Sequence, residues 1–492
     1  MVKSYLFIIK LSTMQPTLQR NIILDIDSYK NDHGKMLPKN TEYIFSTIVP
    51  RRANRYADYV KVMGHQYAIK EYVCQPIEAW MIDEAEIEMR EQGFSFNRAR
   101  WQYLLDKYNG YFPLEIQALP EGFLAPIGVA TVTIVNTDPQ CAWLTSYIET
   151  MFQRVCWKMT TVASISYDLF KYLDDIMYKQ TAQRGRVNFH LHNFGSRGAD
   201  SYESDILAGI AHLSAGFNGT DCAQANRNIK YYYNTSKSYG MSVTASEHSV
   251  MCAWSDSNTH DDLEAVEMMI TLLEEKVASN DGTPIISIVG DTYDIYRLAR
   301  EYIGGIFKQR IIELGAKGAK VVVRPDSGDP LTMCHDVIKI LMEQFGYTVN
   351  KQGYKVLPPY IGVIQGDGIN NDSLRHIAAR LDKSRISLEN IVFGMGSGLT
   401  HDAGRDEFSF SMKATALYDG KEWVDLIKRP ITDLTKQSLK GHVTTYRMPD
   451  GRIYTARLED VPHSATILLE TIYRNGAIIK QYTFDEVLSH NR

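Results

Sequence analysis

The chain has 492 residues, of which 44% are hydrophobic and 23% are charged, and its formal net charge at pH 7 is -5. This length exceeds what one ordinary hydrophobic core supports, so we expect a barrel and a second domain of comparable size. The slight acidic excess argues against a dedicated nucleic-acid binder, and no run approaches the roughly 18 uncharged apolar residues that a membrane span requires.

Residues 1–19 are predicted to form an N-terminal extension rather than a signal peptide. Their apolar stretch is short, Lys10 interrupts it, and no clear small-residue cleavage site follows. The six cysteines of the chain include no CxxC pair, so neither a disulfide framework nor a structural zinc site is indicated. We therefore expect a protein of the reducing cytoplasm.

Residues 20–185 mix predicted helices with a few strands. Apolar residues at helical spacing mark 77–94 and the longer stretch 143–178, and a β-branched run marks 128–136 as a strand. We expect this region to pack with the C-terminal residues 400–492 into one composite α+β domain.

Between residues 186 and 399, seven apolar runs each end in a polar or glycine-rich cluster. The runs are VNFHLHNFGSRG from Val187, IAHLSAGFNGTD from Ile210, SVTASEHS from Ser242, PIISIVGDTYD from Pro284, KVVVRPDSGDP from Lys320, YIGVIQGDG from Tyr360 and NIVFGMGSG from Asn390, with FSFSMKATAL from Phe408 as an eighth candidate. Such runs, separated by stretches long enough for crossover helices, predict parallel strands buried on both faces. The pattern predicts an α/β barrel whose chemistry lies where the strands end.

The strongest single signal follows the run at 320–324, where Arg324 and Asp326 come directly after an apolar strand. Arginine offers paired donors to a phosphate or carbonyl oxygen, and a nearby aspartate can accept from ribose hydroxyls or hold a hydrated Mg²⁺. A turn or helix cap formed by Asp326, Ser327 and Gly328 explains the same residues without a ligand.

Two glycine-rich clusters, 366–368 and 394–398, end successive runs. Backbone N–H groups in such loops can approach an anion closely, although each loop alone is equally typical of a tight strand-to-helix turn. Two of them on adjacent strands resemble the phosphate site that barrels of this kind form after their last strands.

Single residues at other strand ends have both a functional and a structural interpretation. Phe194 could stack on a planar ring, Asp221 could accept a hydrogen bond from a ligand amide, and His248 could carry a proton or accept a phosphoryl group. The structural alternatives are core packing for Phe194, a surface ion pair for Arg197, a helix cap for Asp221 and an ordinary structural histidine at 248.

Taken together, the motifs closely resemble the nicotinamide phosphoribosyltransferase family over nearly the whole chain. They are DSYK at 27–30, HNFGSRG, GTD, SEHS, GDTYDIY from Gly290, VVVRPDSGDP, LPPYIGVIQGDGI and FGMGSGL. The resemblance implies a type II phosphoribosyltransferase with a modified α/β barrel, working as a homodimer with shared active sites. It also implies the transfer of phosphoribosyl from phosphoribosyl pyrophosphate (PRPP) to nicotinamide for NAD salvage, with Mg²⁺ as cofactor and stimulation by ATP.

The resemblance further implies roles for individual residues. Phe194 and Tyr29 of the partner subunit match the pair that sandwiches the pyridine ring, with Asp221 and Arg324 at its carboxamide. Arg324, Asp326, Asp291 and His248 match the catalytic surroundings, with Mg²⁺ near Asp291 or Asp326 and His248 as the histidine that ATP phosphorylates. The PRPP-binding set is Arg197, Gly366, Asp367, Gly396, Ser397, Arg405, Ser411, Lys413, Lys428 and Lys436, of which Arg405, Ser411 and Lys413 come from the other subunit.

Three positions depart from the family pattern: Asn193 replaces an acid, Ser196 a tyrosine and Ser397 a glycine. None removes a charge or ring that the reaction needs. The pyridine nitrogen is already a nucleophile, so the predicted difficulty is the departure of pyrophosphate, and Asp221 is predicted to prefer an amide over an acid. Two other functions stay open at this point: a nicotinate phosphoribosyltransferase, and a catalytically silent PRPP-binding barrel.

Overall fold

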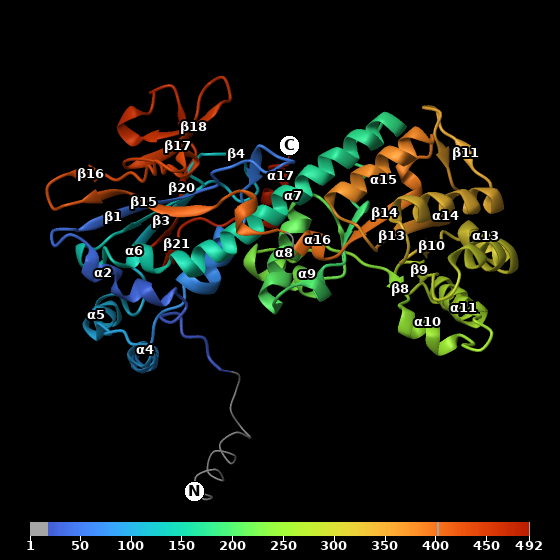
Figure 1. The fold of residues 1–492 in the computed structure, drawn as a ribbon, viewed down its shortest axis with the longest axis horizontal. Helices are drawn as coiled ribbons and strands as arrows, with labels where there is room; N and C mark the ends of the chain where they lie inside the picture. Colours follow the sequence, from blue (N-terminus) through green and yellow to red (C-terminus); the bar gives the residue numbers. More distant parts are fainter. Residues whose placement is uncertain (1–17, 401–402, 492) are drawn as a thin grey trace, which may run out of the picture.

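A long central helix, α7 (Glu149–Thr181), runs between two lobes of the protein (Figure 1). The structure is a computed structural model that describes residues 18–400 and 403–491. Most of the predicted N-terminal extension therefore lies outside the described residues. Although α7 has 33 residues, no helix in the described ranges is long and apolar enough to cross a membrane.

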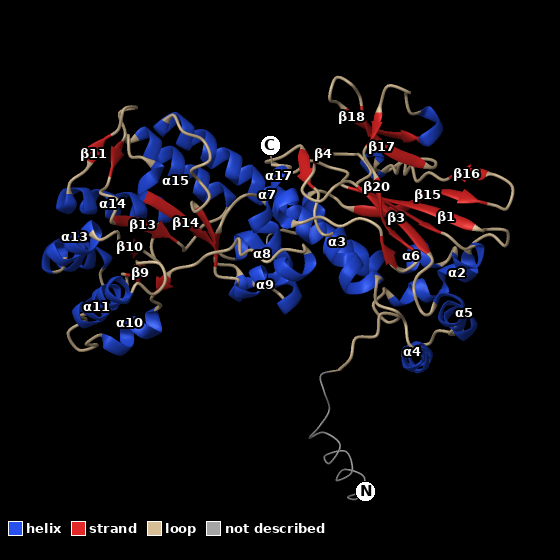
Figure 2. Cartoon of the chain, turned by 180° about the vertical axis from the view of Figure 1, so that it is seen from behind, coloured by secondary structure: helices blue, strands red, loops and turns tan. Residues whose placement is uncertain are grey.

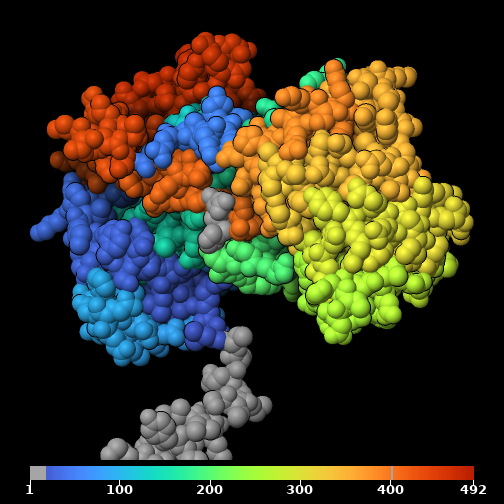
Figure 3. Space-filling model, turned by 45° about the vertical axis from the view of Figure 1, so that its right-hand side comes forward, coloured from blue at the N-terminus to red at the C-terminus, as the bar shows by residue number. Residues whose placement is uncertain are grey.

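The first lobe is built on an antiparallel sheet to which both ends of the chain contribute. Its order is β16-β15-β1-β5-β3-β20-β21. The strands are β1 (Tyr43–Val49), β3 (Leu114–Ala118), β5 (Val132–Asn136), β15 (Ser411–Tyr418), β16 (Trp423–Asp425), β20 (Glu470–Arg474) and β21 (Ala477–Ile478). In the space-filling view, the blue N-terminal and red C-terminal colours accordingly gather in one half of the molecule (Figure 3). The predicted second domain formed from both chain ends is confirmed, while its exact boundaries stay a prediction.

The eighth candidate barrel strand belongs to this composite sheet, so that prediction was wrong. β15 pairs antiparallel with β1 and β16, and Lys413 lies opposite Thr47. At its start, half-buried Ser411 and Lys413 alternate with buried Met412. Such alternation is typical of an antiparallel strand with one solvated face, whereas a barrel strand is buried on both faces.

Helices cover one side of the composite sheet and a small hairpin sheet lies on the other (Figures 1 and 2). The helices are α2 (His33–Met36), α4 (Ala79–Glu91), α5 (Arg98–Tyr108) and α6 (Leu144–Tyr147), and the small sheet contains β17 (Val443–Arg447), β18 (Ile453–Arg457) and β19 (Thr466–Ile467). The predictions of a helix within 77–94, a strand within 128–136 and a long helix within 143–178 are confirmed by α4, β5 and α7.

The second lobe is a parallel sheet of seven strands in the order β7-β6-β14-β13-β10-β9-β8. The strands are β6 (Leu191–Asn193), β7 (Gly219–Thr220), β8 (Thr244–Ala245), β9 (Ile285–Val289), β10 (Lys320–Arg324), β13 (Ile361–Gln365) and β14 (Ile391–Met395). Met241, just before β8, forms a parallel bridge with Gly219 of β7, so the two edges of the sheet meet. Helices α8 (Tyr202–Ser214), α9 (Ala223–Tyr232), α11 (Leu263–Ser279), α14 (Pro330–Phe345) and α15 (Asn371–Lys383) belong to this lobe (Figure 2).

One predicted run changes its structure within the barrel. The run from Ile210 was predicted as a strand, but its first five residues form the last part of α8, and only Gly219–Thr220 are a strand. Ser201 caps the start of this helix by accepting from the N–H of Ser204 at 3.2 Å. The apolar residues of the run therefore form the buried end of α8, and the strand that follows, β7, has only two residues.

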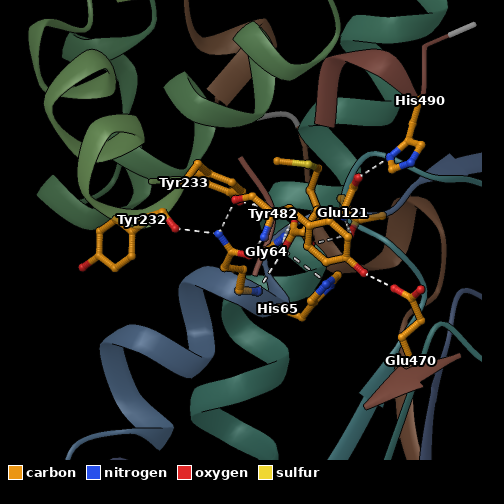
Figure 4. Close-up of polar contacts among 11 residues, drawn as sticks. Gly64, His65, Glu121, Tyr232, Tyr233, Glu470, Tyr482 and His490 are labelled. Atoms are coloured by element: carbon orange, nitrogen blue, oxygen red, sulfur yellow. Dashed lines mark hydrogen bonds and ion pairs between the residues drawn. The ribbon is translucent and has the colours of Figure 1, made fainter. Parts of the chain in front are cut away.

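A buried carboxylate ties the two lobes together (Figure 4). Glu121 has no exposed surface, and its oxygens accept the backbone N–H groups of Gly64 and Gln66, at 3.1 and 2.8 Å. The hydroxyl of Tyr233, which follows α9 of the barrel lobe, donates to Glu121 at 3.3 Å. His490, near the C-terminus, lies 2.8 Å from the Glu121 carbonyl oxygen. Because a buried carboxylate is costly unless it is hydrogen-bonded, Glu121 needs its donors from 64–66 and from Tyr233, and its carboxylate joins these two segments.

Candidate active site

The predicted site residues of the second lobe lie at the carboxyl ends of its strands. Phe194 directly follows β6, Asp291 follows β9 by two residues, Arg324 ends β10 and Gly366 follows β13. Because parallel strands of one curved sheet point the same way, these ends meet at a single rim. The structure thus brings together residues that lie far apart in the sequence.

Phe194 lies over two strand ends that carry no side chain. Its backbone N–H donates to the carbonyl oxygen of Met395 at 2.9 Å, which fixes the residue beside β14. A Cβ added at Gly394 would lie 2.1 Å from Cε2 of Phe194, and one added at Gly366 would lie 3.1 Å from the same atom. The half-buried ring therefore occupies space that only glycine leaves free. Gly394 belongs to the predicted phosphate loop 394–398 and also makes room for the ring of Phe194. The phosphate role of that loop stays a prediction.

Asp221 presents a carboxylate at this rim. Its Oδ1 accepts from the Ser242 hydroxyl at 2.6 Å and lies 3.0 Å from His192 Nε2, and nearly half of its side chain is exposed. Partial burial opposes ionisation, but the hydrogen bonds from His192 and Ser242 and the charge of Arg324 outweigh it and lower the pKa of the Asp221 carboxyl. The group is an ionised acceptor, and sequence reasoning missed both His192 and Ser242 as its partners.

Arg324 supplies unused donors next to that acceptor. Its guanidinium is mostly buried, and its nearest ion-pair contact is Asp326 Oδ2 at 3.7 Å. The Nε of Arg324 is buried and has no hydrogen-bond partner among the described residues. The Arg324 side chain keeps 16% of its surface exposed, so an oxygen at the rim can approach the guanidinium there.

His248 stands between two carboxylates. It is the first residue of α10 (His248–Trp254), and its Nε2 lies 2.9 Å from Oδ1 of the nearly buried Asp291. Its Nδ1 lies 3.9 Å from Oδ2 of Asp326. One ring nitrogen is thus hydrogen-bonded to an acid, while the other faces the rim beside Arg324 and Asp326.

The remaining barrel residues of the predicted PRPP set lie on neighbouring loops. Ser397 begins the short helix α16 (Ser397–Thr400) after Gly396, and a Cβ at Gly198 would lie 3.1 Å from the Ser397 Cβ. The loop that holds Arg197 therefore packs against the loop after β14. Arg197 and Asp367 are both exposed and face no ion-pair partner within the described residues.

Two of the positions that depart from the family pattern are buried in this loop region. Asn193 is fully buried, and its side chain accepts the Gly195 N–H at 2.8 Å and donates to Thr220 at 3.3 Å. The Ser196 hydroxyl is buried and has no partner among the described residues. Asn193 therefore shapes the loop behind Phe194 and is not itself part of the rim.

Ser411 and Lys413 lie in the other lobe, on β15. Together with Thr47 and Arg51 they line a cavity of about 280 Å³. Burial lowers the pKa of the Lys413 ammonium, and the neighbouring charges of Lys428, Arg51 and Lys30 lower it further against the opposing effect of Glu149. This basic cluster is the kind of environment that attracts phosphate oxygens. Arg51 was not predicted from the sequence as a site residue, although it lies two residues after the apolar strand β1, much as Arg324 ends the apolar strand β10.

The basic cluster and the barrel rim belong to different sheets of the chain. In the described ranges, no hydrogen bond or ion pair joins Ser411 or Lys413 to the rim residues Phe194, Asp221 or Arg324. Lys436 pairs with Asp433 at 3.3 Å, and Arg405 pairs with Asp406 at 3.5 Å. Tyr29, predicted to stack on the ring from the partner subunit, is 58% exposed. The predicted site residues therefore lie on both lobes of the chain, and Gly398 of the barrel loops lines one cavity together with Asp406, the neighbour of Arg405.

The described residues contain no group of three or more histidine, cysteine, aspartate or glutamate side chains that could hold a metal ion by themselves. From the residues that the structure describes, Asp326 accepts no close hydrogen bond through its side chain, and the nearest charged atoms, of Arg324 and His248, are 3.7 and 3.9 Å away. It is therefore a carboxylate with oxygens available to a hydrated cation.

Comparisons with known proteins agree with this architecture. Residues 189–476 match the nicotinate phosphoribosyltransferase (NAPRTase) family, and residues 21–116 match the N-terminal domain of nicotinamide phosphoribosyltransferase. The chain is 36% identical to a nicotinamide phosphoribosyltransferase of Xanthomonas campestris, over 96% of this chain and 98% of that one. It is 32% identical to a nicotinamide phosphoribosyltransferase of Acinetobacter baylyi, over 94% and 95% of the two chains. The crystal structure of a nicotinate-nucleotide pyrophosphorylase from Pyrococcus furiosus shares the fold, with a TM-score of 0.57, 13% identity and 97% of both chains covered.

Proposed function

The chain belongs to the nicotinamide phosphoribosyltransferase family, and on this premise we propose that it transfers the phosphoribosyl group of PRPP to the pyridine nitrogen of nicotinamide. The products are nicotinamide mononucleotide and pyrophosphate, and the reaction serves NAD salvage. One observation carries the proposal: the aromatic platform of Phe194 lies at the same rim as an ionised acceptor, Asp221, and an unpaired donor, Arg324. A flat ring with a carboxamide needs this combination.

Nicotinamide would stack on Phe194, while its amide N–H donates to Asp221 and its carbonyl oxygen accepts from Arg324. Stacking and two opposite hydrogen bonds fix both the plane and the rotation of the ring. The ring nitrogen then attacks C1 of the ribose, and no base is required because that nitrogen carries a free electron pair. The bond from C1 to the pyrophosphate oxygen breaks as the new C–N bond forms.

The transition state would place positive charge on the sugar and growing negative charge on the pyrophosphate. Arg197 is exposed on the loop after β6 and can reach an anion at the rim, and Asp326 and Asp291 supply the nearest carboxylates for a cation. Mg²⁺, arriving with the phosphate oxygens of PRPP, would supply further positive charge there. Charge that is better matched to the transition state than to the ground state lowers the barrier.

We propose that the complete site forms between two copies of the chain, with Tyr29 and the basic cluster of Arg51, Ser411 and Lys413 facing the partner's barrel rim. The exposure of Tyr29, and the position of Arg51, Ser411 and Lys413 around a cavity of the other lobe, support this arrangement. Mixing Tyr29→Ala with Arg324→Ala tests it. Each variant alone should be inactive, and the mixture should recover about one quarter of wild-type activity, because half of randomly mixed dimers carry one intact site. No recovery from a confirmed mixed dimer would contradict the shared site.

We also propose that ATP stimulates the enzyme through His248. A ring nitrogen would attack the γ-phosphorus of ATP, ADP would leave, and a phosphohistidine would remain until water hydrolyses it. The hydrogen bond that His248 Nε2 donates to Asp291 fixes the ring and its tautomer, which is the usual effect of such a carboxylate. Radiolabel from γ-labelled ATP should be acid-labile on the wild type and absent from His248→Asn. Equal stimulation of both proteins by ATP would refute the role.

The direct test of the function is product analysis with PRPP, Mg²⁺ and either nicotinamide or nicotinate. Nicotinamide mononucleotide from the amide alone is the expected result. A product from nicotinate alone would show that the protein is a nicotinate phosphoribosyltransferase. PRPP binding without a product from either substrate would indicate a silent binding protein.

A further inference from the structure

We propose that His192, held in place by close packing against Gly219, orients Asp221 and so determines how strongly the enzyme prefers an amide over a carboxylate substrate. His192 is thus a positioning residue, and Gly219 is the residue that positions it. This inference rests on the proposed function, because it concerns the selectivity of the same site.

The described residues use only one of the two carboxylate oxygens of Asp221. Both donors, His192 Nε2 at 3.0 Å and the Ser242 hydroxyl at 2.6 Å, approach the same oxygen, Oδ1. Within the described part of the chain, no hydrogen bond is made to Oδ2. One oxygen is therefore fully engaged by the protein, and the other is left for a ligand N–H group. Without the two donors, the carboxylate would be free to rotate about its Cβ–Cγ bond.

The imidazole of His192 lies between Asp221 and the stacking ring of Phe194. His192 lies on β6, its side chain is only 11% exposed, and its ring centroid is 5.1 Å from that of Phe194. The same imidazole thus contacts both the stacking platform and the amide acceptor. A displacement of the imidazole would therefore change how the Phe194 ring and the Asp221 carboxylate are oriented relative to each other.

Gly219 packs against the imidazole of His192 on the side away from Asp221. Gly219 on β7 pairs with His192 across the sheet, and a Cβ added at Gly219 would lie 2.6 Å from Nδ1 and 3.0 Å from Cγ of His192. Any side chain there would push the imidazole away from the strand and off its contact with Asp221. The hydrogen bond between His192 Nε2 and Asp221 therefore requires that position 219 carry no side chain.

Selectivity follows from these contacts. A fixed Oδ2 accepts from the amide N–H of nicotinamide and repels the carboxylate of nicotinate, so it favours one substrate and rejects the other. A carboxylate that rotates freely loses part of both effects. Weakening the His192 contact should therefore lower kcat/KM for nicotinamide and leave the value for nicotinate equal or raised.

Two substitutions of His192 separate its hydrogen bond from its shape. His192→Phe keeps a ring beside Phe194 but removes the donor, whereas His192→Gln places an amide N–H near the position of Nε2. We expect the nicotinamide-to-nicotinate ratio of kcat/KM to fall about 10- to 100-fold in His192→Phe and to stay near the wild-type ratio in His192→Gln. The KM for PRPP should be unchanged in both. A wild-type ratio in His192→Phe, or an equal fall in His192→Gln, would overturn the proposed donor role.

Gly219→Ala tests the packing without altering either polar residue. The ratio should fall in the same direction as in His192→Phe, although His192 and Asp221 are both present. A folded Gly219→Ala protein with the wild-type ratio would overturn the role of Gly219, and if it does not fold, the pair of His192 variants still decides the role of His192. Failure of the proposed function is separately visible, because the wild-type protein would then make no nicotinamide mononucleotide.

Discussion

Replacing Gly394 with alanine should selectively damage nicotinamide binding. The new Cβ would lie 2.1 Å from Cε2 and 2.3 Å from Cδ2 of Phe194. Carbon atoms in contact are about 3.5–4.0 Å apart, so the ring must move by about 1.5 Å. Because a displacement of about 1 Å from the reactive geometry can cost about 100-fold in rate, we expect kcat/KM for nicotinamide to fall at least about 100-fold.

Initial rates at varied nicotinamide and saturating PRPP measure this effect, and the reverse experiment gives the KM for PRPP, which should not change. Gly305→Ala is the matched control, because its Cβ would meet only the Arg300 carbonyl oxygen, at an ordinary 3.6 Å. That control should retain wild-type kinetics. A Gly394→Ala enzyme with wild-type kcat/KM for nicotinamide would refute the argument that the glycine makes room for the stacking ring.

Three further predictions concern charge. Asp221→Asn should narrow or invert the preference for nicotinamide over nicotinate, and an unchanged preference in paired assays would exclude Asp221 as the selector. Burial lowers the pKa of Lys61 to about 7, against the opposing charge of Glu121, so from pH 7 to about 10 the unfolded chain binds more protons and the free energy of unfolding should rise with pH. Denaturant titrations of Lys61→Met should show a smaller rise, and an identical pH profile would contradict this reasoning. Glu121→Gln turns an amide toward the N–H donors of Gly64 and Gln66 and should cost about 2–4 kcal/mol of unfolding free energy, whereas a wild-type midpoint would show that the buried charge is not needed.

The sequence by itself was enough to predict the barrel and its rim. Parallel strands buried on both faces appear in a sequence as nearly continuous apolar runs. The polar clusters that end these runs therefore place Phe194, Arg324 and Gly366 at strand ends. The order of the motifs also led to the family. These features are local, since each depends on residues that are close in the chain.

Only the tertiary structure decided which side chains meet and what each glycine does. A strand pattern does not identify the neighbouring strand. The run from Phe408 was therefore both an eighth barrel candidate and part of the C-terminal region 400–492, and its pairing with β1 decides for the composite sheet. Likewise Gly394 and Phe194 are 200 positions apart, and their contact depends on two strands being adjacent. His192, Gly219 and Asp221 form one unit for the same reason. The sequence specifies strand ends because they follow from local periodicity, whereas selectivity depends on contacts between strands, which only the closed sheet creates.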